Sequence, residues 1–202
     1  LNHRGNPDTL VLSPDITYDL MVHTIPPIEK KGITIQKGKH NVIPVDAPQG
    51  YLKLELDGTL SKYYPTSVIR KKGDMNTLNI QEFGKTEKYI VGKYDIEILT
   101  LPRIKLFDVE IQQSTTNTIK VPTSGNAYVT KGGTGYGSIF VDDGKKVTWV
   151  CNLNNSLQNE IIYLQPGNYK LEFRYEGIKE TIKTVERKFT IASGVTTNVK
   201  LN

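Results

Sequence analysis

The sequence is poor in the side chains that most enzymes and metal sites use. It has one cysteine, Cys151, and three histidines among 202 residues. A lone cysteine excludes an intramolecular disulfide framework, and scattered histidines do not supply the paired ligands of ordinary zinc sites. The patterns Gly-x-Ser-x-Gly, His-Glu-x-x-His, the P-loop and the EF-hand calcium loop are absent. We therefore expect no enzymatic activity, no metal and no cofactor.

Long apolar runs are missing as well. No stretch approaches the ~18 apolar residues of a membrane-spanning helix, so we expect no direct membrane insertion. The sequence starts at Leu1 without the basic and apolar pattern of a signal peptide, and we expect any targeting signal to have been removed or to have lain upstream. A single cysteine suits either a cytosolic protein or an exported one built without disulfides.

Positive charge is present in moderate excess, with 26 Lys and Arg against 21 Asp and Glu. Nucleic-acid-binding surfaces cluster basic and aromatic residues, whereas the lysines here are spread over many segments. We expect these lysines to lie on solvent faces and sheet edges, where a hydrated charge opposes edge-to-edge pairing. The charge pattern predicts no nucleic-acid partner.

Short segments with apolar residues at alternate positions run through the chain, for example at 18–22, 53–57, 94–98 and 169–173. This period places one face of a strand on a core and the other in water. The pair Asp143-Gly144 lies between two such segments and predicts a tight hairpin, because Gly tolerates positive φ. No amphipathic helix of ten or more residues is evident, so the predicted class is all-β.

The chain also resembles itself. Residues 18–45, shifted by 76 positions, lie without gaps on residues 94–121, and ten of those 28 positions are identical. A more divergent third copy begins at Tyr169. Each copy closes with two strands around a turn centred on Gly38, Ser114 or Gly194. This pattern predicts either a hairpin or a corner between two sheets.

The position of the repeat predicts the domains. The third copy ends with the chain at Asn202, so the two closing strands end a unit. We expect complete β-sandwich units at 47–122 and 123–202. Residues 1–46 would then hold the closing half of an earlier unit, completed by a neighbour or by upstream sequence. The predicted fold class is all-β, with tandem small β-sandwich units (Ig-like or prealbumin-like) and an additional N-terminal half-unit.

Three tyrosines recur at one position of the repeat: Tyr18, Tyr94 and Tyr169. Recurrence in every copy indicates a structural hydroxyl hydrogen bond at a strand corner rather than a binding role. We expect His23 to be a strand histidine with a structural environment, and His40 to be solvated in a turn. Cys151 is expected to be a small packed residue.

The segment 132–137, Gly-Gly-Thr-Gly-Tyr-Gly, is rich in glycine. A nucleotide loop would need a helix after it, whereas a strand is predicted here, so we expect a flexible loop. Gly133, Tyr136 and Trp149 are the candidate ligand-contact residues, because aromatic rings hold sugars and extended peptides. Trp149 alternates with Val147, however, and we expect its ring to point into the core.

The order of elements resembles the small β-sandwich repeats of bacterial surface proteins, including PEGA-type and carboxypeptidase-regulatory-like modules. The segments 24–28, 47–51 and 87–95 are similar to the β-rich region that follows the von Willebrand factor A (VWA) domain in bacterial envelope proteins. The resemblance implies an exported protein, whether periplasmic, cell-surface or secreted. Its partner would be a protein, either an adjacent domain or a surface partner. Some related modules form intramolecular Lys–Asn isopeptide bonds, but the sequence alone does not indicate which residues would do so.

Repetition without converging titratable groups predicts a non-enzymatic structural or interaction module that spaces or presents an adjacent domain and mediates adhesion. Two alternatives stay open. One is a carbohydrate- or peptide-binding β-sandwich that uses the glycine-rich segment and nearby aromatics. The other is self-assembly in which the half-unit accepts or donates a strand.

Overall fold

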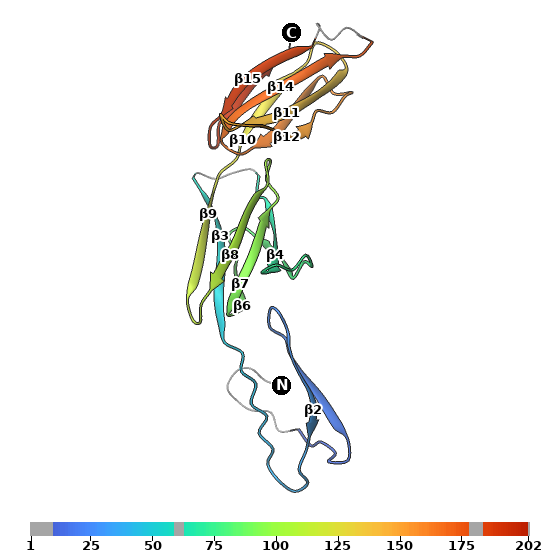
Figure 1. Ribbon diagram of the computed structural model, residues 1–202, viewed down its shortest axis with the longest axis vertical. Coiled ribbons are helices and arrows are strands. Elements are labelled where there is room, and N and C mark those ends of the chain that lie inside the picture. The colour runs from blue at the N-terminus through green and yellow to red at the C-terminus, as the bar shows by residue number, and fades with distance from the viewer. Residues whose placement is uncertain (1–9, 59–62, 178–183, 202) are drawn as a thin grey trace.

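The computed structural model describes residues 10–58, 63–177 and 184–201. Every regular element in these ranges is a β-strand, so the predicted all-β class is confirmed. No helix in the described ranges is long and apolar enough to cross a membrane. The strands form three bodies in a row along the long axis of the molecule (Figure 1). They are an N-terminal hairpin, a first sandwich and a second sandwich.

The hairpin consists of β1 (Thr17–Val22) and β2 (Ile28–Thr34), which pair antiparallel as a separate two-stranded sheet. The first sandwich contains β3 (Gln49–Asp57), β4 (Thr66–Lys71), β5 (Asn79–Glu82), β6 (Thr86–Ile90), β7 (Gly92–Ile98), β8 (Ile104–Ile111) and β9 (Thr116–Pro122). A three-stranded sheet, β6-β3-β9, and a four-stranded sheet, β5-β4-β7-β8, enclose a core that includes Leu52, Leu54, Ile69 and Ile98.

The second sandwich has the same strand order. It contains β10 (Gly125–Thr130), β11 (Gly135–Asp142), β12 (Val147–Asn152), β13 (Asn159–Leu164), β14 (Gly167–Tyr175), β15 (Val185–Ile191) and β16 (Thr196–Lys200). Its sheets are β13-β10-β16 and β12-β11-β14-β15. Val129, Ile139, Leu171 and Phe173 are among its core residues. The confirmed fold is thus a pair of small β-sandwiches preceded by the hairpin of a half-unit.

Each sandwich begins and ends with strands that are parallel neighbours. β3 pairs with β9 over seven residues, and β10 pairs with β16 over five. The closing strands lie in different sheets, because β8 and β15 belong to the four-stranded sheets. The predicted turn between them is therefore a corner between sheets, where Ser114 and Gly194 have positive φ. The Asp143-Gly144 turn joins β11 and β12, so that predicted hairpin is confirmed.

Adjacent bodies are connected by equivalent hydrogen bonds. The backbone N–H of Ile90, at the end of β6, donates to the carbonyl of Ile25 in the hairpin loop at 2.7 Å. The N–H of Gln165, just after β13, donates to the carbonyl of Leu101 in the first sandwich, also at 2.7 Å. The rings of Tyr63 and Tyr163 stack across the second junction with centroids 5.0 Å apart. The same loop of one body thus contacts the same strand end of the next.

Candidate functional site

A lysine lies inside the second sandwich. Ala127, Val129 and Lys131 follow one another at alternate positions at the end of β10, so Lys131 continues the row of side chains that faces the core. Its side chain is 0% exposed. The expectation that the lysines lie on solvent faces is therefore wrong at this position. Burying an unpaired ammonium is very unfavourable, so the local structure must supply partners.

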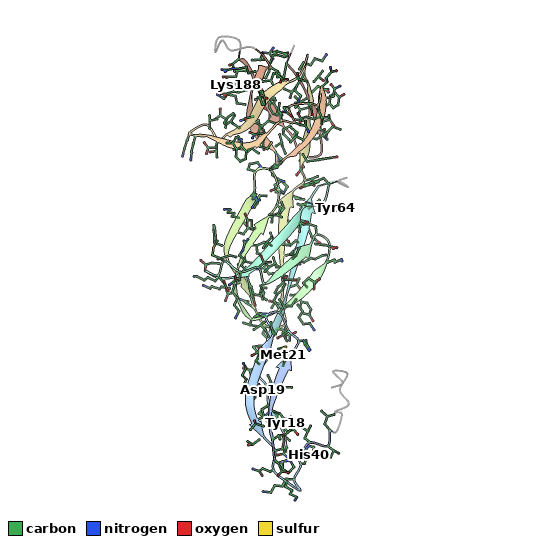
Figure 2. All side chains as sticks on the ribbon, turned by 90° about the vertical axis from the view of Figure 1, so that its right-hand side faces the viewer. Tyr18, Asp19, Met21, His40, Tyr64 and Lys188 are labelled. Carbon is green, nitrogen blue, oxygen red and sulfur yellow. The ribbon has the colours of Figure 1, made fainter. Side chains whose placement is uncertain are left out.

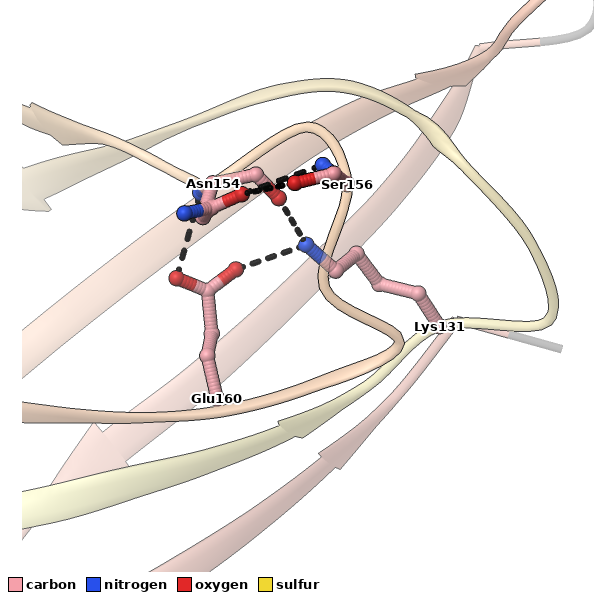
Figure 3. Close-up of polar contacts among 4 residues, drawn as sticks. All are labelled: Lys131, Asn154, Ser156 and Glu160. Carbon is pink, nitrogen blue, oxygen red and sulfur yellow. Dashed lines mark hydrogen bonds and ion pairs between the residues drawn. The ribbon is translucent and has the colours of Figure 1, made fainter.

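Lys131 has two polar partners, which Figure 3 shows, and one aromatic partner. Its Nζ lies 2.7 Å from Oε1 of Glu160, at the start of β13, and donates to the carbonyl of Asn154 at 2.5 Å. The ammonium also lies 5.9 Å from the ring centroid of Phe173, within the range of a cation–π contact. Together these groups offset much of the cost of burying the charge.

Glu160 is held in place as well. Its Oε2 accepts a hydrogen bond from the backbone N–H of Asn154 at 3.2 Å, and its side chain is only 11% exposed. The loop that supplies Asn154 is fixed in turn, because the Oδ1 of Asn154 accepts hydrogen bonds from both the backbone N–H and the hydroxyl of Ser156. An amine and a carboxylate are therefore kept in contact, largely away from water.

The last described residue lies beside this pair. The N–H of Leu201 donates to the carbonyl of Thr130, which directly precedes Lys131. The hydroxyl of Tyr175 donates to the carbonyl of Leu201 at 3.1 Å. In the sequence, Asn202 follows Leu201 directly, but it lies outside the described residues.

Sequence reasoning missed both Lys131 and Glu160. The signal for Lys131 was the alternation Ala127-x-Val129-x-Lys131, which places a lysine on the apolar face of a strand. Glu160 gives no comparable signal, because it becomes a partner only through the antiparallel pairing of β10 with β13.

The three candidate ligand-contact residues have different surroundings. Tyr136 is 62% exposed and lines an open groove of about 640 Å³. Trp149 is 57% exposed, and its Nε1–H donates to Oδ1 of Asn152, which also lines the groove. Gly133 is not among the groove-lining residues, and a Cβ built on it would lie 3.6 Å from the ring of Tyr175.

The expectation that Trp149 points into the core is wrong. The pairing of β11 with β12 shifts register between Ile139 and Phe140. Ile139 pairs with Cys151 and Phe140 pairs with Trp149, so one residue of β12 is skipped. The intervening Val150 is 7% exposed and supplies the inward side chain of the strand. Trp149 and Val147 therefore share the solvent face.

The expectation of a flexible loop over the whole glycine-rich segment is also wrong. β11 already begins at Gly135 and pairs with β14. A Cβ on Gly135 would lie 2.3 Å from the carbonyl oxygen of Arg174 and 2.6 Å from the ring of Phe173. This glycine lets two strands and a core ring approach closely, which is a packing role.

The three recurring tyrosines all donate to a backbone carbonyl four or five residues upstream. The hydroxyl of Tyr94 reaches Ile90 and that of Tyr169 reaches Gln165, both at 2.6 Å. Burial raises the pKa of Tyr94 to about 12 and raises the pKa of Tyr169 further. The hydroxyl of Tyr18 reaches the carbonyl of Ser13 at 3.2 Å in an exposed setting.

The remaining chemical candidates do not converge. His23 is exposed and follows the end of β1, so the expectation of a strand histidine in a structural environment is wrong. His40 lies at the far end of the hairpin body (Figure 2). Cys151 is half-buried against the second core, and burial raises the pKa of its thiol to about 11, which disfavours the nucleophilic thiolate. Within the described part of the chain no three His, Cys, Asp or Glu side chains form a group able to hold a metal ion.

No protein-family model matches the sequence, and a search of curated proteins gave no significant match. Solved structures that it is similar to include the Bacillus anthracis TIE protein, at 14% identity and a TM-score of 0.32 over 90% of this chain and 39% of that one. A streptococcal ancillary pilin matches at 12% identity with a TM-score of 0.32. The match covers 87% of this chain and 70% of the pilin chain. The pilus adhesin SpaC from Lactobacillus rhamnosus GG, in its open conformation, matches at 9% identity with a TM-score of 0.26. The match covers 75% of this chain and 31% of the adhesin chain.

Proposed function

We propose that this chain is a non-enzymatic structural module of an exported bacterial surface protein, in which stacked sandwiches space and present a neighbouring domain. The units would be 47–122 and 123–202, with 1–46 as the closing part of a further unit. Association with a VWA domain and an adhesive role are part of this proposal.

The observation that carries the proposal is the parallel pairing of the first and last strand in each sandwich. The chain enters each sandwich at one end along β3 or β10 and leaves it at the other end along β9 or β16 (Figure 1). A pull on the two ends of a sandwich then loads all hydrogen bonds between those strands at once, in shear. Such a geometry suits a strut that transmits tension.

Single-molecule force spectroscopy tests this role. With handles at the two ends of the chain, we expect the first sandwich to resist several-fold more force than with handles at Gln49 and Thr116. Those two residues lie at the same end of β3 and β9, so pulling there breaks the hydrogen bonds one after another. Equal forces in both geometries would contradict the proposal.

We further infer that Lys131 forms an intramolecular amide bond with the side chain of Asn202. Lys131 would pass a proton to Glu160 and become a neutral amine, the nucleophilic form. Attack of Nζ on Cγ of Asn202 would form the N–C bond, Glu160 would pass its proton to Nδ2, and the Cγ–Nδ2 bond would break as ammonia leaves. The second proton that Nζ loses on becoming an amide nitrogen would go to the Glu160 carboxylate. The bond would tie the first strand of the second sandwich to the chain that follows its last strand. Tension would then bypass this sandwich.

Intact mass measures the bond directly. We expect the purified chain to weigh about 17 Da less than its sequence requires, the mass of one ammonia. Lys131→Arg, Glu160→Gln and Asn202→Ala should each restore the full mass, while Lys188→Arg, at an exposed lysine of β15, should not. A wild-type chain of full mass would exclude the bond, and a deficit that persists in Asn202→Ala would exclude this acyl donor.

A second candidate function is binding of a carbohydrate or an extended peptide in the groove beside β11. It is favoured by the exposure of Tyr136 and Trp149 and by groove-lining polar side chains such as Asn155 and Arg174. Trp149 is the sole tryptophan, so its fluorescence reports on the site.

We expect a bound glycan to change this fluorescence in wild type but not in Tyr136→Ala. Tyr128→Ala, in the other sheet, is the control. An unchanged response in Tyr136→Ala would argue against this groove.

A further inference from the structure

The groove beside β11 lies on the outer face of a sheet. β11 and β14 are the two inner strands of the four-stranded sheet in the second sandwich (Figure 1). These two strands supply four of the groove-lining residues that alternate with core positions: Tyr136, Ser138, Glu172 and Arg174. By strand register Tyr136 lies opposite Arg174, and Ser138 lies opposite Glu172. The groove therefore brings aromatic, hydroxyl and charged groups together on one surface.

The groove holds a cation that has no carboxylate partner. Glu172 and Arg174 are its charged lining residues. Glu172 is neutralised by Lys170, whose Nζ lies 2.6 Å from its Oε1. Arg174 donates from Nη2 to the hydroxyl of Thr184 at 3.3 Å, and no carboxylate in the described part of the chain pairs with it. A guanidinium in this state suits a carboxylate ligand, to which it can donate two parallel hydrogen bonds.

Asn152 adds a further donor to the groove. Its Oδ1 accepts hydrogen bonds from the hydroxyl of Ser138 and from the indole N–H of Trp149, both at 2.9 Å. The amide oxygen is thus occupied, while Nδ2 has no acceptor among the described residues and is available to a ligand. Asn155 lines the same groove with a second amide. Free donors in this arrangement favour a ligand rich in acceptor oxygens.

The first sandwich has the same sheet without these groups. Its β4 and β7 pair as β11 and β14 do, with Ile69 opposite Ile96 where the second sandwich has Ile139 opposite Leu171. Counted from these pairs, the groove positions of the first sandwich carry smaller or apolar residues: Thr66 for Tyr136, Val68 for Ser138 and Leu99 for Arg174. The fold therefore does not require the aromatic ring or the guanidinium. Groups that one copy has and the other lacks fit a binding role better than a structural one.

We propose that this groove binds an acidic polysaccharide. Carboxylates of the glycan would pair with Arg174, its hydroxyls would accept from the amide of Asn152, and its sugar rings would pack on Tyr136 and Trp149. This inference rests on the second candidate function given above and names the ligand class of that groove.

The position of the strands favours a glycan over an extended peptide. A peptide that adds to a sheet pairs with the backbone of an edge strand. β11 is paired on both sides, with β12 and with β14, and β14 is paired with β11 and β15. The backbones beneath the groove are therefore already occupied, and a ligand there must be recognised by side chains.

Calorimetry on the whole chain tests the proposal. The probes are a galacturonate hexamer and a hyaluronan hexasaccharide, each compared with its carboxyl-reduced form, in which a neutral CH₂OH group replaces the carboxylate. We expect saturable binding of an acidic probe, at least tenfold tighter than binding of its reduced form and weakened by salt. Arg174→Gln should remove this difference, whereas Tyr136→Ala should weaken both forms alike. Arg187→Gln is the matched control, because Arg187 donates to the carbonyl of Lys200 and does not line the groove.

The outcomes separate this inference from the function on which it rests. Equal binding of an acidic probe and its reduced form would overturn the carboxylate preference and leave glycan binding in the groove in place. Failure of all four oligosaccharides to bind would overturn both. A hexaglutamate peptide that bound as tightly as the acidic probes would show that the groove recognises charge alone, and would count against a glycan. None of these results depends on the force or mass measurements described above.

Discussion

The first and second sandwiches share their strand order and differ most clearly where their opening strands end. By strand register, Leu56 takes the place of Lys131, and Lys85 takes that of Glu160. Leu56 packs against its core, and Lys85 is an exposed lysine that pairs with Glu82. One position at the rim of the core is thus apolar in one sandwich and carries a charged pair in the other. The strand order therefore does not require the pair, which is an addition to the second sandwich.

The largest expected effect tests this difference. Lys131→Ala leaves Glu160 without its partner in a largely buried place, and removing one member of a buried pair costs about 3–5 kcal/mol of unfolding free energy. Loss of the proposed amide bond would add to this. Leu56→Ala is the matched change in the first sandwich. It should cost about 1–2 kcal/mol, less than truncation of a fully buried leucine.

Calorimetry of the whole chain can follow both sandwiches, because each substitution should move the transition of its own sandwich. Lys131→Met combined with Glu160→Leu should recover much of the loss, since a buried ion pair can be replaced by apolar side chains of similar size. If Lys131→Ala left both transitions unchanged, the buried pair would have no structural importance.

A second prediction concerns a feature that the sandwiches share. Gly50 is the second residue of β3 and Gly125 is the first residue of β10. An added Cβ would lie 2.0 Å from the carbonyl oxygen of Gln112 at Gly50 and 2.3 Å from that of Ala192 at Gly125. Backbone must move to admit it, so alanine at either position should cost about 1–3 kcal/mol. Gly92→Ala is the control, because its nearest neighbour would be 3.8 Å away. Urea unfolding that showed no difference from this control would mean that the strands are packed less closely than described.

Much of this architecture could be predicted from the sequence, because it follows from short-range patterns. Alternation along β7 and β14 marks the strands, and Asp143-Gly144 marks a hairpin through the positive φ of its glycine. The site could not be predicted in the same way. Glu160 meets Lys131 only through strand pairing, and a local irregularity in β12 reverses the face expected for Trp149. Contacts between strands and single-residue shifts leave little trace in periodicity.

The recurring tyrosines offer a graded comparison of all three bodies. Replacing Tyr169 by Phe removes a hydroxyl that donates to a buried carbonyl, so we expect a loss of about 1 kcal/mol. Tyr94→Phe should cost the same or slightly less, because its hydrogen bond is partly buried. Tyr18→Phe should cost nearly nothing, since water can replace the exposed bond to Ser13. Thermal unfolding of the three variants measures the order, and a large effect of Tyr18→Phe would contradict it.

The smallest expected effect distinguishes the two faces of β12. Trp149→Ala should change the unfolding free energy by no more than about 0.5 kcal/mol, because the ring lies mostly in solvent. Val150→Ala, its neighbour on the core side, should cost about 1–2 kcal/mol through the cavity it leaves. Acrylamide should quench the fluorescence of this single tryptophan almost as efficiently in the folded chain as in urea. If acrylamide quenched Trp149 poorly in the folded chain and Trp149→Ala lowered the free energy of unfolding strongly, the ring would lie in the core. The groove would then have no exposed tryptophan beside it.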